Sequence, residues 1–268
     1  MCREQNKVHG KCGDVCFINK YLIIIELWKK DENMVDQRFM RFSSLVGEAG
    51  FSRLKNSKVI IFGVGGVGSF IAESLARCGI GTITLVDFDD IAIHNINRQI
   101  HALTSTVGEL KAAVMAERIL DINPQCHVNV IAEKVDPQNL DAFFQEDYDY
   151  IADAIDDVPA KIALISYGEI KGIPLISSMG TGNKLDPSRL KIADISKTSV
   201  CPLCRSVRKK LREIGIECGV EVVYSDEHPS KSPLMDQGRP VPASSALVPP
   251  AAGILIASHI VRKIMESE

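Results

Sequence analysis

The chain has 268 residues, 46% of them hydrophobic and 24% charged, and its formal net charge is −3. This length and composition suit one large α/β domain with a well-buried core, with or without a small appendage. The net negative charge excludes a bulk attraction to nucleic acid, so any RNA contact must come from a local basic patch.

Residues 1–33 form a distinct N-terminal extension in our interpretation, ahead of a single domain at 34–268. They contain Cys2, Cys12 and Cys16 and the apolar run YLIIIELW, which is far too short to span a bilayer. These cysteines and His9 match no common zinc-site spacing. Because the eight cysteines are irregularly spaced and no secretory signal pattern precedes them, we expect reduced thiols in a cytoplasmic protein without a membrane span.

The glycine-rich stretch after the first strand is the strongest signal in the chain. An apolar run at 59–62 predicts a buried strand, GVGGVG follows it, and apolar positions then recur at helical spacing. Gly63 permits the tight turn, Gly65 lets the backbone approach a phosphate, and Gly68 lets the helix lie close to the strand. A second strand at 83–86 ends before Asp87, where a Rossmann-type unit places the acid that accepts ribose hydroxyls. The pattern predicts a nucleotide site; the alternative is a glycine-rich turn without a ligand.

Polar residues after the second strand indicate which nucleotide binds. Within 25 residues the chain brings together two acids, an amide and two cations, namely Asp87, Asp89, Asn95, Arg98 and Lys111. A polyanion needs cations aimed at the charge that develops during cleavage at phosphorus, so this set favours a triphosphate. Lys111 falls in the first turn of a predicted helix, where a cation gains nothing from the dipole. It is either a ligand contact or a solvated lysine.

Further strands are predicted at 127–132, 148–152, 174–177 and 190–195, with helices at 35–55, 137–144 and from 158 onward. The strand at 148–152 runs into DAIDD, at the end of a parallel strand where open α/β sheets bind ligands. Its carboxylates, Asp153, Asp156 and Asp157, either bind a ligand or cap the next helix. A small-residue loop at 178–182 follows the next strand.

The last third holds a CPLC pair, a basic helix, a loop and an apolar helix. Cys201 and Cys204 precede RSVRKKLREIG, in which Arg205, Arg208, Lys209 and Arg212 share one face at helical spacing. Residues 225–242 contain four prolines among polar residues and predict a flexible exposed loop. The final helix, from about 249, is too short and interrupted for a membrane span and should pack on the sheet or across a dimer.

GVGGVGS, DFDDIAIHNINRQ, VGELK and DAIDD, in this order and spacing, resemble the ThiF/MoeB-like superfamily of ubiquitin-activating-type adenylating enzymes. NINRQIHAL, MAERILDINPQC and DAIDDVPAKIALI resemble its tRNA threonylcarbamoyladenosine dehydratase branch. The similarity runs from about residue 36 to residue 265. It implies an α/β fold with a Rossmann-like sheet, in which a parallel nucleotide-binding half is continued by a mixed or antiparallel second half.

The resemblance also implies ATP and magnesium as cofactors and a homodimer. Asp156 matches the magnesium-binding aspartate. Arg41 matches an arginine that reaches the phosphates of the neighbouring subunit, with Arg38 as the close alternative; a solvated helix face is the other interpretation of this segment. The implied catalytic set is Arg41, Arg98, Lys111 and Asp156. The implied nucleotide contacts are Gly63, Gly65, Gly66, Gly68, Asp87, Asp89, Asn95, Arg98 and Lys111.

The substrate implied is the carboxylate of the threonyl group on an adenosine beside the tRNA anticodon. Adenylation activates this carboxylate, and the neighbouring carbamoyl group then closes on it without a protein nucleophile. The alternative activity is adenylation of a sulfur-carrier protein, and a cysteine desulfurase or sulfur acceptor is a possible partner. We expect the basic face Arg205, Arg208, Lys209 and Arg212 to bind tRNA. The CPLC pair matches half of a four-cysteine zinc site; without His228 or a partner chain it stays one ligand short, so zinc is not expected.

Overall fold

The computed structural model describes residues 36–233, 235–236 and 239–266, and the chain divides into two compact units, residues 1–41 and 42–268. In the first unit, the Arg38 guanidinium pairs with Asp36 at 2.9 Å. The helix α2 (Met40–Asn56) bends at Gly47, whose φ is 75°. The proposed 1–33 extension, with its three cysteines, lies outside the described residues.

The second unit is built on a seven-stranded sheet in the order β3-β2-β1-β4-β5-β7-β6. Every neighbouring pair is parallel except β6 and β7, so the antiparallel strand lies at one edge. This confirms the predicted α/β class with a parallel half and a mixed second half. The strands are β1 (Lys58–Phe62), β2 (Thr82–Val86), β3 (His127–Ile131), β4 (Tyr150–Asp153), β5 (Leu175–Ser178), β6 (Leu190–Asp194) and β7 (Glu221–Ser225).

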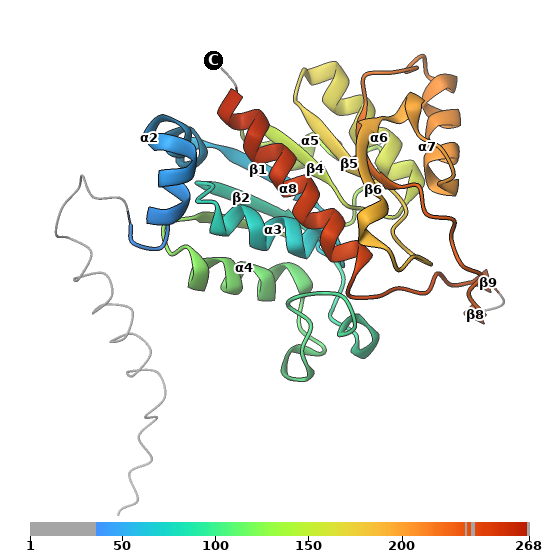
Figure 1. The fold of residues 1–268 in the computed structure, drawn as a ribbon, viewed down its shortest axis with the longest axis horizontal. Coiled ribbons are helices and arrows are strands. Elements are labelled where there is room, and N and C mark those ends of the chain that lie inside the picture. Colours follow the sequence, from blue (N-terminus) through green and yellow to red (C-terminus); the bar gives the residue numbers. More distant parts are fainter. Residues whose placement is uncertain (1–35, 234, 237–238, 267–268) are drawn as a thin grey trace, which may run out of the picture. The chain divides into compact units, whose positions relative to one another are not determined.

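Helices cover both faces of this sheet (Figure 1). Residues of β1 alternate between the faces: Val59 and Ile61 join one apolar cluster, whereas Ile60 and Phe62 join the other. The first cluster includes α3 (Gly68–Arg77), α4 (Lys111–Ile122) and α8 (Val248–Glu266). The opposite face carries α5 (Leu140–Phe143), α6 (Val158–Lys171) and α7 (Pro202–Glu213).

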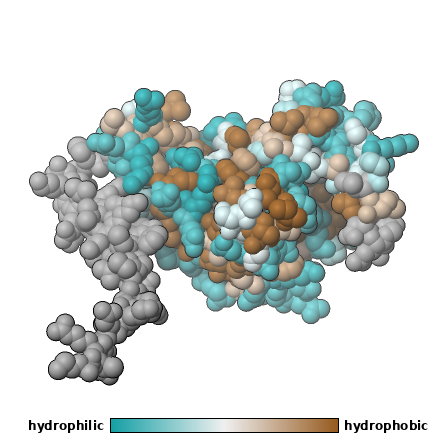
Figure 2. Space-filling model, turned by 90° about the horizontal axis from the view of Figure 1, so that it is seen from below, coloured by the Kyte–Doolittle hydropathy of each residue, from teal (hydrophilic) through white to brown (hydrophobic). Residues whose placement is uncertain are grey.

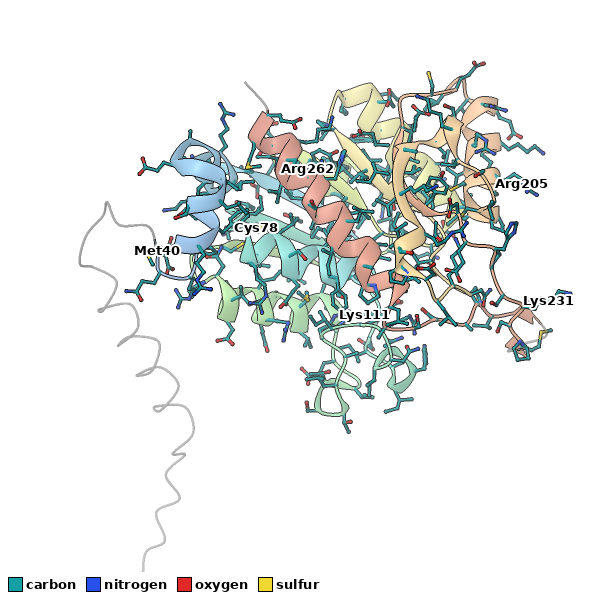
Figure 3. The ribbon with its side chains drawn as sticks, viewed as in Figure 1. Met40, Cys78, Lys111, Arg205, Lys231 and Arg262 are labelled. Carbon is teal, nitrogen blue, oxygen red and sulfur yellow. The ribbon has the colours of Figure 1, made fainter. Side chains whose placement is uncertain are left out.

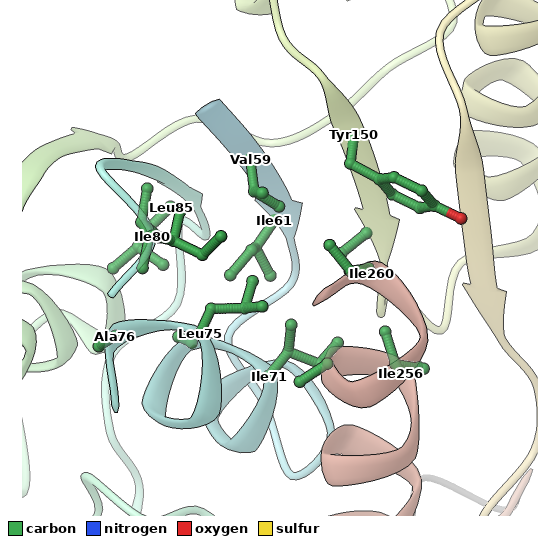
Figure 4. Close-up of a cluster of buried hydrophobic side chains, with 14 of the residues drawn as sticks. Val59, Ile61, Ile71, Leu75, Ala76, Ile80, Leu85, Tyr150, Ile256 and Ile260 are labelled. Carbon is green, nitrogen blue, oxygen red and sulfur yellow. The ribbon is translucent and has the colours of Figure 1, made fainter. Parts of the chain in front are cut away.

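The closest helix pair of this unit is α3 with α8, whose isoleucines and leucines interdigitate beneath β1 and β4 (Figure 4). Ile71 and Leu75 of α3 and Ile256 and Ile260 of α8 are all fully buried. Gly253 permits this approach, because a Cβ there would lie 2.4 Å from the Val67 carbonyl oxygen. The last helix of the chain therefore supports the N-terminus of the helix that follows the glycine loop.

Three sequence expectations about secondary structure were wrong or incomplete. The helix predicted at 137–144 shrinks to Leu140–Phe143, because Asp136 and Asn139 form a side-chain-bonded turn around Pro137. Strand β7 was not predicted at all, although it pairs on both sides. The predicted loop at 225–242 begins with the last residue of β7 and carries a short antiparallel pair, β8 (Met235–Asp236) and β9 (Arg239–Pro240).

The connections of the sheet reverse direction at the carboxyl end of β1. From β1 the chain moves outward through β2 to β3, and it then returns to pair β4 on the other side of β1. At such a reversal the loops after the two central strands diverge, and open α/β sheets bind ligands there. The glycine loop and the DAIDD loop follow these two strands. Among the described helices, none has the length and hydrophobicity needed to cross a membrane.

Candidate functional site

The glycine loop lies directly against the loop that follows β4. Gly63 has a φ of 84°, and a Cβ on it would meet the Ala154 carbonyl oxygen at 2.9 Å. A Cβ on Gly68 would lie 1.8 Å from the Gly63 carbonyl oxygen, so the first residue of α3 can only be glycine without a backbone shift. The N-terminus of α3 is thereby brought onto the loop, where the positive end of the helix dipole favours an anion, although the N–H groups of Ser69 and Phe70 already donate to the carbonyls of Gly65 and Val67.

Asp87 fastens the glycine loop to the end of β2. The Val64 N–H donates to its carboxylate at 2.6 Å, and the Asp89 N–H donates to the other oxygen at 2.9 Å. The side chain is 8% exposed, and burial raises its pKa even though these two bonds and Lys111 favour the ionised form. Asp87 therefore stabilises the glycine loop, in addition to its predicted contact with ribose.

Lys111 is neither solvated nor free. It is the first residue of α4, is 7% exposed, and its Nζ lies 2.6 Å from the Asp89 carboxylate. The alternative of a solvated lysine is therefore wrong, because Asp89 compensates a buried cation that the helix dipole disfavours. Figure 3 shows Lys111 on the side of the sheet that carries the 88–110 segment.

Arg98 and Asn95 belong to the segment that covers the glycine loop. The Asn95 side-chain oxygen accepts from the Ala92 N–H at 2.9 Å and orders this segment. The Arg98 methylenes lie against Gly66, at 3.2 Å from the position of a Cβ there, and its Nη1 donates to the His94 carbonyl and to Asn97. Burial lowers the pKa of Arg98, and the nearby Asp156 carboxylate opposes this shift. Arg98 and Asp156 thus reach the loop from two different segments.

The three carboxylates of DAIDD have three separate roles. Asp157 caps α6, its side chain accepting from the Ala160 N–H at 2.9 Å. Asp153 is fully buried and holds the loop through the Ile155 N–H. Asp156 is exposed, and no hydrogen bond or ion pair holds it in place within the described part of the chain. The capping explanation therefore holds for Asp157, and Asp156 is the carboxylate available to a ligand.

Sequence reasoning missed Lys161, the buried partner of Asp153. Its ammonium group donates to Asp153 at 2.7 Å, to the Ser177 hydroxyl at 3.0 Å and to the Ser178 carbonyl at 3.0 Å, with neither charged side chain exposed. All three donors are used, as a buried ammonium requires. Lys161 comes eight residues after Asp153 on an otherwise apolar helical face, and that position is the only signal the sequence offers.

Gln99 and His101 are a second omission. Gln99 is 5% exposed, its Nε2 lies 3.8 Å from the position of a Cβ on Gly65, and its Oε1 has no hydrogen-bond partner. His101 is 2% exposed, and neither ring nitrogen has a partner. A buried polar group without a partner is costly, so the amide of Gln99 beside the glycine loop marks room for a polar ligand.

The basic residues of α7 meet around one surface hollow. Its volume is about 420 Å³, and its lining consists of Arg205, Arg208, Lys209, Arg212 and Glu213. Arg208 is bound to the protein itself, because its Nη1 donates to the carbonyls of Ile195 and Thr198. Arg205 is exposed at the outer side of α7 (Figure 3). Three of the four expected tRNA contacts are thus exposed cations, and the fourth is partly committed to the fold.

The CPLC pair is not a simple loop. Cys201 occupies the N-cap position of α7 without a capping hydrogen bond from its side chain, and Cys204 lies in the first turn. No cluster of three or more potential metal ligands occurs among the described residues. Arg41 is an exposed residue of the first unit.

Comparisons with known proteins agree with this geometry. The model of the ThiF family matches residues 37–268. The chain belongs to the ThiF family. A tRNA threonylcarbamoyladenosine dehydratase of Bacillus subtilis is 44% identical over 241 residues, covering 85% of this chain and 95% of the relative. The Escherichia coli protein of the same name is 41% identical over 213 residues, covering 77% of each chain.

The fold of this ThiF-family chain is also similar to a solved structure. The crystal structure of the Escherichia coli tRNA N6-threonylcarbamoyladenosine dehydratase in complex with ATP matches with a TM-score of 0.78 and 39% identity. The match covers 85% of this chain and 94% of that one.

His101 makes the folded state sensitive to acid. Burial, together with the nearby Lys111 and Arg118, lowers its pKa to about 4 from an unfolded value near 6.5. Because the unfolded chain takes up this proton first, the contribution is fully present above about pH 6.5 and is lost as the pH falls toward 4. As the pH falls from 7 to 5, the free energy of unfolding of the unaltered chain decreases. We expect this decrease to be about 2 kcal/mol smaller in His101→Gln. Urea unfolding measures this, and His127→Gln, at an exposed histidine, should behave like the unaltered chain.

Proposed function

We propose that this protein is an ATP-dependent tRNA threonylcarbamoyladenosine dehydratase that acts in the cytoplasm. The observation that carries the proposal is the glycine loop with Arg98 and Asp156 beside it. This loop occurs in a chain that is 44% identical to a dehydratase and covers 95% of that protein. The close backbone packing at Gly63 and Gly68 holds the loop at the start of α3, and the unpaired amide oxygen of Gln99 beside it fits a polar ligand such as a nucleotide. ATP is a substrate here, and it supplies the adenylyl group that activates the carboxylate.

The residues around the glycine loop suit attack of a carboxylate at the α-phosphate. Arg98 supplies positive charge at the loop, and the positive end of the α3 dipole adds to its attraction for phosphate oxygens. Asp87 keeps the loop in place. The ion pair of Lys111 and Asp89 has a net charge near zero, and its cationic end can turn toward a polyanion. Pyrophosphate departs and an acyl-adenylate forms. The carbamoyl nitrogen or oxygen of the same nucleoside then closes on the activated carbonyl and releases AMP, so the protein needs to orient the substrate and exclude water.

Magnesium is part of this proposal, with Asp156 as its protein ligand. The exposed Asp156 carboxylate fits a magnesium ion, which commonly takes one or two carboxylates together with phosphate oxygens and waters. When bound, the ion would neutralise charge on the triphosphate. A single carboxylate agrees with the absence of a preformed ligand cluster among the described residues.

Replacing Asp156 tests the active site directly. We expect Asp156→Asn to lower turnover about 100-fold or more, because a group that stabilises developing charge is removed. The assay incubates modified tRNA with ATP and magnesium and follows, by mass spectrometry of the nucleosides, the loss of one water from threonylcarbamoyladenosine. Asp147→Asn makes the same charge change at the amino end of β4 and should leave turnover unchanged. Adenylation of a di-glycine-tailed carrier protein with no reaction on tRNA would instead support the sulfur-carrier alternative.

We also propose that α7 binds the anticodon arm of tRNA. Arg205, Lys209 and Arg212 are exposed on one face, and with Arg208 they line a single hollow in a protein whose net charge is −3. The helix begins at Cys201, beside Gly180, which follows β5 at the carboxyl edge of the sheet. The basic face therefore starts on the same edge as the glycine loop.

The salt dependence of tRNA binding tests this surface. A variant with Arg205, Lys209 and Arg212 changed to Glu keeps the structural Arg208 and should bind tRNA more weakly, with a logarithmic salt slope smaller by roughly two to three units. Its affinity for ATP should not change. A matched control places the same three charge reversals at the exposed Lys134, Lys171 and Arg262. Equal losses of tRNA affinity in both variants would attribute the effect to net charge and remove α7 from the interface.

We further propose a homodimer in which Arg41 acts on the neighbouring subunit. Support comes from exposed apolar side chains in the segment after β2, with Phe88 51%, Ile93 65% and Leu103 54% exposed. Figure 2 shows apolar surface among hydrophilic residues on the face seen from below. Burying such groups is favourable and commonly marks an interface. Association with a cysteine desulfurase or a sulfur acceptor stays a prediction.

Sedimentation velocity decides whether this segment joins two subunits. Ile93→Glu with Leu103→Glu should shift the protein from dimer to monomer at micromolar concentration, because two charges would have to be buried. Ile170→Glu is the control, since Ile170 is 78% exposed on α6 and belongs to the opposite face of the sheet. A dimer that withstands the double change would place the interface elsewhere.

A further inference from the structure

The CPLC segment takes no part in the proposed reaction, yet it holds two buried thiols side by side at the start of α7. Cys201 and Cys204 are 3% and 1% exposed, at the N-cap and in the first turn of α7. Residues three apart at a helix start have Cα atoms about 5 Å apart. This separation lies within the roughly 4.4–6.8 Å that a disulfide spans, so the two sulfurs can bond without moving the helix.

Hydrogen-bond donors and a cation converge on the Cys201 sulfur. The Cys204 thiol, the N–H groups of Cys204 and Gly180, and the Lys184 ammonium all lie close enough to the Cys201 sulfur to lower the pKa of its thiol. Gly180 fits closely, because a Cβ there would lie 3.6 Å from Sγ of Cys201. Lys184 is 4% exposed and is held in place by the carbonyls of Gly180 and Ser225, at 3.0 and 3.1 Å.

This environment gives Cys201 the opposite character from the half-buried Cys78 and the buried Cys126. The hydrogen bond from Cys204 is the main reason that the pKa of Cys201 lies below its ordinary value, and it outweighs burial. At Cys78 and Cys126, by contrast, burial raises the pKa to about 11 and about 12. Donation to Cys201 raises the pKa of Cys204, which keeps that thiol protonated until its partner has reacted. The thiolate is the reactive form of cysteine, so only one of these four should react at neutral pH.

We propose that Cys201 and Cys204 are a redox-active dithiol that a small hydroperoxide converts to an intramolecular disulfide. The Cys201 thiolate attacks one peroxide oxygen, the O–O bond breaks, and the departing hydroxide takes a proton to become water. This leaves a sulfenic acid on Cys201. The Cys204 thiol then loses its proton and attacks Sγ of Cys201, the S–O bond breaks, and a second water leaves. The two thiols lose two electrons and two protons, and the peroxide is reduced to two waters.

Peptide mapping of the full-length protein tests this site. The protein is treated briefly with hydrogen peroxide at pH 7, its remaining thiols are alkylated, and each cysteine peptide is weighed. We expect the peptide with Cys201 and Cys204 to lose two hydrogens and resist alkylation, and dithiothreitol to restore both thiols. The half-buried Cys78 and the buried Cys126 should stay reduced, and Cys126 provides the internal control for burial.

Two variants separate the steps. In Cys204→Ser, Cys201 should stop at the sulfenic acid and be captured by dimedone, whereas in Cys201→Ser the Cys204 thiol should not react with peroxide. Retained ATP binding shows that each variant is folded. The proposal is overturned if both thiols of the unaltered protein remain open to alkylation at a peroxide dose that oxidises the exposed Cys218. Disulfide formation with a different cysteine would overturn it as well.

Discussion

Two buried carboxylates hold the loops between which the site lies. Asp87, at the end of β2, accepts the N–H of Val64 in the glycine loop, and Asp153, at the end of β4, accepts the N–H of Ile155 in the next loop. An ionised carboxylate is tolerated away from water only when its oxygens are paired. Both carboxylates therefore need hydrogen bonds from the loop N–H groups, and these bonds fix the course of each loop. The contact of Gly63 with Ala154 follows from this.

This arrangement divides the charged residues of the site into supports and ligand contacts. Lys161 neutralises Asp153, Lys111 pairs with Asp89, and Asp157 caps a helix. Asp156 and the guanidinium of Arg98 remain nearest to the glycine loop with their charge available. Because the supporting charges are already paired and few charges contact the ligand, the site needs little reorganisation when a triphosphate binds. Such preorganisation is the condition for effective electrostatic stabilisation.

Helix α7 combines two features that the proposed chemistry uses differently. Its exposed side carries Arg205, Lys209 and Arg212, suited to a polyanion, while its buried first turn holds the cysteine pair. Cys201 touches Gly180, and Ser178 of the same loop accepts from Lys161, which neutralises Asp153. Oxidation of the thiol pair would therefore occur three contacts away from the loop that holds Asp156, on the edge of the sheet where nucleotide and tRNA are proposed to bind.

Local sequence signals determined the nucleotide-binding half of this protein. The positive φ of Gly63, the close packing of Gly68 and the register of Asp87 follow from constraints within about 25 residues, so spacing alone could reveal them.

The tertiary structure alone decided which polar residues are supports. Lys161 and Asp153 are eight residues apart, but their pairing also requires Ser177 of the neighbouring strand, and Lys111 looks solvated until Asp89 is placed beside it. Strand β7 escaped prediction because five residues beside a polar segment carry little periodic signal, and its identity as a strand depends on β5 and β6. Burial and pairing are properties of the assembled sheet, and periodicity along the chain records only which residues alternate.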